Sequence, residues 1–129
     1  MIGQSVQSDL ERQFHLAILD IYRIAKAKLN YTASYFLRMV GEQGGVQAAL
    51  TLLHAPAVSD GFTRLHISRR LDLSVEAYVL RSEFVGLFSE EERAIARRRL
   101  QEVGCDATGR PMPRVQRVRS ARSLTDQTF

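Results

Sequence analysis

The sequence predicts an all-α protein: a compact orthogonal bundle of about five to six helices with a long N-terminal helix and a disordered, basic C-terminal tail. Apolar residues recur every three or four positions through the first hundred or so residues, which is the helical period. No stretch of useful length alternates apolar and polar residues as a strand does. From Asp106 onward neither period remains, so we predict a helical domain over residues 1–105 and a tail over residues 106–129.

The long first helix is predicted from Ser8 to about Asn30. Ser8 and Glu11 have the spacing of a capping box, in which two side chains satisfy free backbone N–H groups at a helix start. One face then carries apolar residues at Leu10, Phe14, Ala17, Ile18, Ile21, Ala25 and Leu29. Because Leu16, Leu19 and Ile24 widen this face, we expect other helices to pack on two sides of it.

Shorter helices follow, and glycines and capping residues set their bounds. Thr32 is expected to cap the second helix, and Gly44 with Gly45 is expected to end it and to let the third helix pack closely. Ser89 and Glu92 have the spacing of another capping box. The predicted ranges are 32–42, 46–53, 62–70, 74–80 and 89–103.

Composition limits the classes of protein that fit the chain. Apolar residues make up 45% and charged residues 25% of its 129 positions, which is ordinary for one globular domain. The single cysteine, Cys105, excludes an internal disulfide and favours a reducing compartment. The first residues lack the basic and apolar regions of a signal peptide, and no apolar run approaches the roughly 20 residues of a membrane span. We therefore expect a cytoplasmic protein with no membrane partner.

The positive charge lies mainly in the tail. Residues 1–105 hold 13 Lys and Arg against 12 Asp and Glu, whereas residues 106–129 hold five Arg against two Asp. A basic tail on a nearly neutral domain attracts polyanions, although such tails are also common as solvated chain.

Three segments resemble a group of small bacterial helical proteins that have no catalytic residues assigned to them. The segments are GGVQAALTLL at 44–53, SDGFTRL at 59–65 and RLDLSVE at 70–76. The resemblance extends over about residues 9–104 and implies a shared helical fold. The chain departs from the pattern at residues 66–69, where the group often has a tryptophan-containing segment, and the arginine-rich tail lies outside the resemblance.

No motif predicts catalysis, a metal site or a cofactor. The three histidines, His15, His54 and His66, fall in different elements, and their spacing is not that of a metal site. Cys105 follows a helix C-terminus, which does not stabilise a thiolate. Asp72 and Glu76 share a helix face, but nothing in the sequence points to a shifted pKa. An enzyme of unrecognised type is therefore the least favoured of three functional hypotheses.

The second hypothesis is a small nucleic-acid-associated protein. Arginines could neutralise phosphates and release their counterions. The candidate residues are Arg97, Arg98, Arg99, Arg110, Arg114, Arg117, Arg119 and Arg122. The short helix from Asp72 to Leu80 starts with acidic residues, which argues against its insertion into a major groove.

A polar cluster in the middle of the chain has two interpretations. Its members are Asp60, Arg64, Arg69, Arg70 and Asp72. They could form a recognition loop in which planar guanidinium groups bind an anion or a partner carboxylate. Alternatively, the two aspartates cap helix starts and the arginines pair with them.

The favoured hypothesis is a non-enzymatic helical adaptor. The first helix is apolar around more of its circumference than a lone surface helix needs. We expect its partner to be another protein or a second copy of the chain, with DNA or RNA binding through the tail as the alternative.

Overall fold

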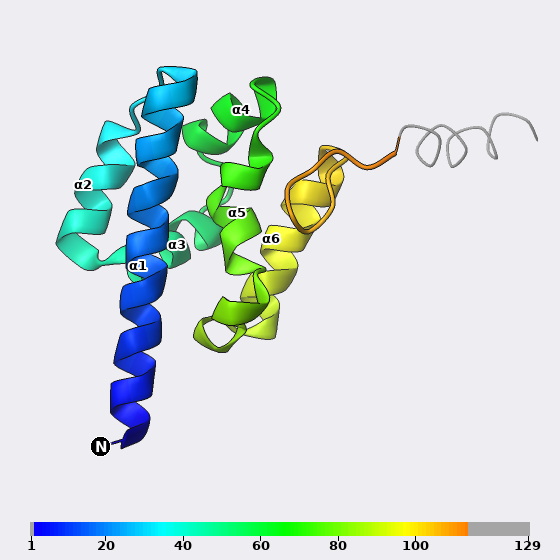
Figure 1. Ribbon diagram of the computed structural model, residues 1–129. Coiled ribbons are helices and arrows are strands. Elements are labelled where there is room, and N and C mark those ends of the chain that lie inside the picture. The colour runs from blue at the N-terminus through cyan, green and yellow to red at the C-terminus, as the bar shows by residue number, and fades with distance from the viewer. Residues whose placement is uncertain (1, 114–129) are drawn as a thin grey trace, which may run out of the picture.

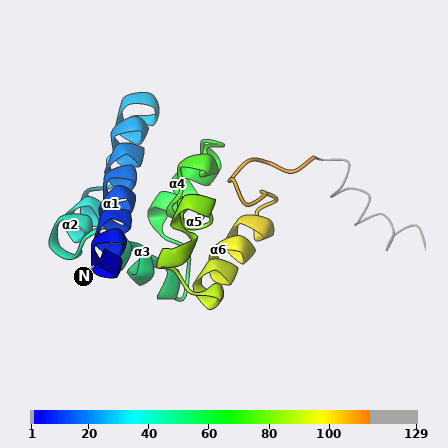
Figure 2. The same ribbon diagram turned by 60° about the horizontal axis from the view of Figure 1, so that its bottom comes forward.

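The predicted all-α fold with a long first helix is confirmed. A computed structural model describes residues 2–113, with side chains from Asp9 onward, and this part of the chain contains helices and no strand. The helices are α1 (Ile2–Leu29), α2 (Ser34–Gln43), α3 (Gly45–His54), α4 (Asp60–Ile67), α5 (Val75–Val79) and α6 (Glu90–Glu102). Two 3-10 helices, η1 (Leu71–Leu73) and η2 (Ser82–Leu87), flank α5. In both views α1 and α2 lie on one side and α6 on the other, with α4 and α5 between them (Figures 1 and 2).

The first helix begins earlier than the capping box predicted. It starts at Ile2, so Ser8 lies inside α1 and does not mark its beginning. Once a helix is nucleated, each further residue adds a hydrogen bond at little cost, and residues 2–7 contain no proline to prevent this.

The expectation that α1 is packed on two sides is wrong for two of its leucines. Phe14, Ile18 and Ile21 are fully buried in the core. Leu16 and Leu19, however, are 56% and 37% exposed, and they extend the apolar face beyond what the other helices cover.

The short helix α3 is the central element of the bundle. It contacts α1, α2, α5 and α6. Ala48 and Ala49 are fully buried, and their small side chains let these neighbours approach closely. The predicted break at the two glycines is confirmed: Gly44 has a φ of 90° between α2 and α3, a conformation that favours glycine.

Serine side chains begin three of the later helices. Ser59, Ser74 and Ser89 accept hydrogen bonds from backbone N–H groups at the starts of α4, α5 and α6, and Ser89 forms the predicted capping box with Glu92. The expected cap at Thr32 is wrong, because α2 begins after Ala33 without a side-chain cap.

The prediction of an unstructured tail from Asp106 needs correction for residues 106–113. These residues form a loop, the C-terminal loop, that folds back on the domain. An isolated β-bridge joins Cys105 and Pro111, and Met112 N–H donates a 2.8 Å hydrogen bond to Gly104 O. Gly109 is buried and packs on Leu71 so closely that a Cβ there would lie 2.3 Å from the Leu71 carbonyl oxygen. The rest of the predicted tail, residues 114–129, lies outside the described residues.

None of the described helices is both long and apolar enough to span a membrane.

Candidate functional site

An apolar groove of about 680 Å³, the aromatic groove, lies where the α1–α2 junction meets the α3–α4 loop. Three aromatic rings come from one short stretch, at Tyr31, Tyr35 and Phe36, and Tyr22 adds a fourth from α1. The opposite wall is the loop of residues 55–59, which includes Pro56. The other lining residues are Thr32, Ala33, Ser34, Leu52, Asp60 and Gly61.

Packing fixes one part of the aromatic wall and leaves another open. The rings of Tyr22 and Phe36 are buried and lie 5.1 Å apart at an interplanar angle of 44°. Tyr35, on the next position of α2, is 72% exposed, and Val58 across the groove is also exposed. The groove therefore has a rigid aromatic floor and apolar side chains at its rim.

Two tyrosine hydroxyls in the groove remain protonated at neutral pH. Burial is the main cause that raises the pKa of Tyr22 and of Tyr31, and the charge of Asp60 raises the pKa of Tyr31 further. A neutral phenol can donate a hydrogen bond, so these hydroxyls suit carbonyl acceptors of a bound chain.

Of the predicted recognition loop, Asp60 lines this groove, and Arg64 packs on Tyr31, one of the lining residues. Asp60 is exposed in the first turn of α4, which Ser59 caps, so the expectation that Asp60 is the capping residue is wrong. No Lys or Arg of the described residues forms an ion pair with Asp60, and it is the only charged residue that lines the groove. The Arg64 guanidinium lies 5.2 Å from the centre of the Tyr31 ring and donates a 3.3 Å hydrogen bond to Leu29 O.

The other three members of that loop lie elsewhere. Arg70 and Asp72 form a pair with two hydrogen bonds of 3.0 and 3.1 Å, as the structural interpretation expected, but Ser74 caps α5 and Asp72 does not. Arg69 lines a different cavity, beside His66. The structure therefore does not bring the five residues together as one recognition loop.

One of the three α6 arginines predicted to bind nucleic acid lies in the core. Arg99 is only 8% exposed, because it pairs with Glu76 and donates hydrogen bonds of 3.0 and 2.7 Å to Leu52 O and Ala55 O. It is therefore not available to phosphates. Arg97 lies 3.6 Å from Glu90, whereas Arg98 is exposed.

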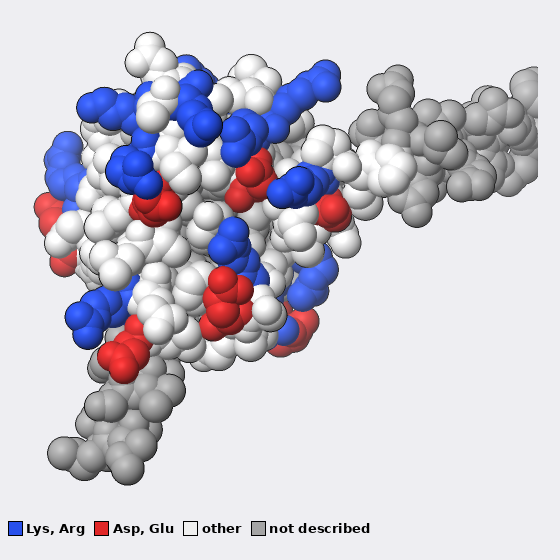
Figure 3. Space-filling view, in the orientation of Figure 1, with Lys and Arg blue, Asp and Glu red and all other residues white. Residues whose placement is uncertain are grey.

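Charge on the surface in Figure 3 is mixed. Lys and Arg gather toward the top of the view, over the end of α1 and over α4, with Asp and Glu among them. Arg110 is exposed in the C-terminal loop. The tail arginines lie outside the described residues, so nucleic-acid binding stays a prediction; they are Arg114, Arg117, Arg119 and Arg122.

The histidines occupy three separate environments. His15 Nδ1 accepts a 3.0 Å hydrogen bond from Gly45 N–H and so satisfies a free donor at the start of α3. His54 Nε2 lies 3.1 Å from a carboxylate oxygen of Glu92. His66 and Cys105 line one cavity, which the sequence spacing did not indicate. Residues 2–113 contain no group of three or more His, Cys, Asp or Glu that could hold a metal ion.

Comparison of the chain with protein-family models, with curated proteins and with solved structures gives no match.

Proposed function

We propose that this domain is a protein-interaction module that binds an extended, proline-containing segment of a partner protein in the aromatic groove. The observation that carries this proposal is the groove itself, an apolar channel with four aromatic rings and one carboxylate that forms no ion pair with the described residues. It supports the adaptor hypothesis more directly than the exposed leucines of α1 do, because it has both shape and polar groups.

The aromatic composition favours an extended proline-containing ligand. Proline-rich segments adopt the polyproline II conformation before they bind, so they lose little entropy when they dock on aromatic-lined grooves. Their carbonyl groups have no internal hydrogen-bond partners and can accept from the tyrosine hydroxyls that line the groove.

Asp60 adds a preference for a basic residue in that segment. Its carboxylate is exposed and lacks an ion-pair partner among the described residues, whereas Arg64 is already placed on the Tyr31 ring. A lysine or arginine of the ligand opposite Asp60 would complete the charge pattern.

Titration of the full, isotopically labelled chain with the capped peptide PPLPPRPP, followed by NMR, tests the proposal. We expect saturable shifts in the amides of residues 31–36 and 55–61, and about tenfold weaker binding by Tyr35→Ala, which removes an exposed aromatic side chain. The matched control is Ile67→Ala, because Ile67 is 74% exposed and lies outside the groove. Absence of saturable shifts in these two segments would refute the proposal.

A second peptide, PPLPPQPP, isolates the contribution of Asp60. The chain should prefer the arginine peptide by about two- to fivefold, a typical size for an exposed charge pair, and Asp60→Asn should abolish the preference. Light scattering on the unliganded chain addresses self-association: a dimer that Tyr35→Ala dissociates would make a second copy the occupant of the groove.

A further inference from the structure

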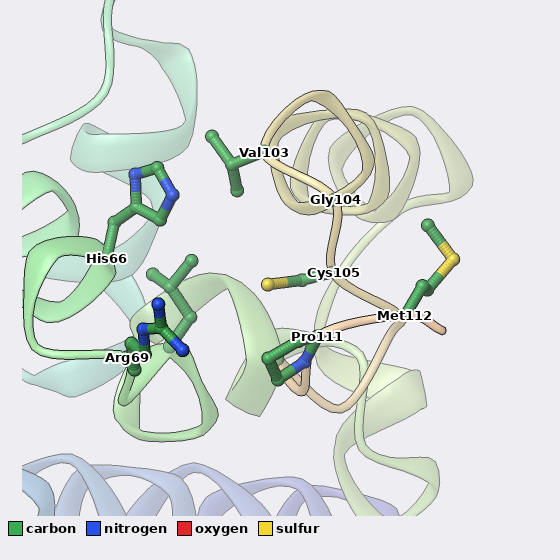
Figure 4. Close-up of a pocket in the computed structure, with 9 residues that line it drawn as sticks. His66, Arg69, Val103, Gly104, Cys105, Pro111 and Met112 are labelled. Carbon is green, nitrogen blue, oxygen red and sulfur yellow. The ribbon is translucent and has the colours of Figure 1, made fainter. Parts of the chain in front are cut away.

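A second cavity, of about 370 Å³, lies between the end of α4 and the C-terminal loop. Figure 4 shows that the His66 ring, the Arg69 guanidinium and the Cys105 thiol point toward a common space. Apolar side chains complete the wall, and they belong to Leu71, Val103, Pro111 and Met112. The volume is at the lower end of the range of about 300–1,000 Å³ that is common for small-molecule sites.

The polar groups of this cavity favour a negatively charged ligand. No Asp or Glu of residues 2–113 lines it, and Arg69 supplies a permanent positive charge. The Arg69 guanidinium forms no hydrogen bond or ion pair with any described residue, in contrast to its neighbour Arg70, which Asp72 binds through two hydrogen bonds. His66 provides a further ring N–H donor at the same space.

The backbone conformation that places Arg69 at this cavity is unfavourable for arginine. Arg69 has a φ of 60°, the left-handed conformation that ends many helices and that glycine adopts most readily. Hydrogen bonds from Arg69 N–H to His66 O and from Arg70 N–H to Leu65 O close the end of α4 in this conformation. Glycine would serve the backbone better, so the presence of arginine is better explained by its side chain.

We propose that this cavity binds a small organic carboxylate, whose apolar body fills the space beneath the C-terminal loop and whose carboxylate pairs with Arg69. This cavity is separate from the aromatic groove, because the two sites share no lining residue. A guanidinium fork matches a carboxylate in a planar arrangement with two hydrogen bonds, and the apolar wall supplies the contact area that a carboxylate alone lacks.

The test compares two probes that differ in charge and share their apolar body, 4-phenylbutyrate and 4-phenylbutyramide. In an NMR titration of the full chain, the carboxylate should shift the amides of residues 66–71 and 103–112 saturably, and the amide should bind about tenfold more weakly. Arg69→Gln should remove this preference, whereas the control Arg38→Gln, an exposed arginine on α2, should keep it. Because Cys105 is the only cysteine, carboxylate binding should also slow its alkylation by iodoacetamide.

A second variant, Arg69→Gly, removes the side chain without straining the backbone, so its folding should not be impaired. Arg69→Gly removes the guanidinium and suits the left-handed conformation, so its thermal midpoint should not fall below that of the wild type while its preference for the carboxylate is lost. Equal binding of the two probes to the wild type, no binding of either, or an undiminished preference in Arg69→Gly would overturn the proposal.

Discussion

At the scale of single residues, the buried pair of Glu76 and Arg99 has the largest energetic consequence. Glu76 is 2% exposed, and Arg99 Nη1 lies 3.3 Å from its Oε2. Arg99 Nη1 also donates to Leu52 O, and Nη2 donates to Ala55 O, at the end of α3. Arg99 therefore joins α6 to α5 and to α3. Removal of one partner of such a pair leaves a charge in the core, and this costs more than the pair itself contributes.

Arg99→Met should accordingly lower the free energy of unfolding by about 3–5 kcal/mol. The double variant Glu76→Leu with Arg99→Met should be more stable than the single variant, since it leaves no buried charge behind. Urea unfolding of the three chains measures both values. A double variant less stable than Arg99→Met would show that Glu76 is not an uncompensated buried charge in the single variant.

Stability should also depend on pH through Glu76. Burial, the largest influence, raises the pKa of Glu76 above its ordinary 4.5, although its own backbone N–H and Arg99 act in the opposite direction. The folded chain therefore holds this proton to higher pH than the unfolded chain does. Its contribution to stability is fully present below pH 4.5 and is lost as the pH rises through the folded pKa.

The stability of the wild type relative to Glu76→Gln should hence be greatest below pH 4.5 and decrease above it. Unfolding by urea at several pH values gives this difference directly. A difference that is constant or increases with pH would contradict the assignment.

At the scale of elements, helix periodicity and capping residues predicted most of the bundle, and they failed where tertiary contacts replaced local ones. Ser89 with Glu92 begins α6 as expected, because both partners of that cap are three residues apart. The cap of α3 comes from His15, thirty residues earlier in the sequence, and no local pattern can indicate it. Thr32 has the right side chain for a cap, yet α2 starts two residues later.

Gly41 and Gly45 should respond oppositely to substitution by alanine. A Cβ at Gly45 would lie 2.7 Å from His15 Cα, so Gly45→Ala should push α3 away from α1 and cost about 1–3 kcal/mol. Gly41, inside α2, has nothing within 4 Å of such a Cβ, so Gly41→Ala should gain about 0.5–1 kcal/mol. Thermal unfolding of both variants distinguishes them, and a loss of similar size in each would rule out the close approach of α3 to α1 as the cause.

At the scale of the whole molecule, the candidate sites arise from segments that are distant in the sequence. The sequence singled out Asp60, but no pattern indicated that Tyr22 of α1 and the loop after α3 share a groove with it. Likewise, His66 and Cys105 are 39 positions apart and meet only because the C-terminal loop returns to η1. Composition and helical periodicity predict which residues are buried. They predict far less well which residues come together at a site.

At the scale of the whole molecule, residues 106–113 should also belong to the folded unit. Loss of residues 106–113 would expose Leu71 and remove the backbone bond between Met112 and Gly104, whereas a chain that ends at Pro113 keeps both contacts. A chain that ends at Pro113 should therefore unfold at the same temperature as the full chain. A chain that ends at Cys105, the boundary expected from the sequence, should unfold several degrees lower, since about 1 kcal/mol corresponds to roughly 4–8 °C in a domain of this size. Differential scanning calorimetry compares the three chains. Equal midpoints for the two shortened chains would mean that the C-terminal loop adds nothing to the fold, and that its contact with Leu71 serves only to close the second cavity.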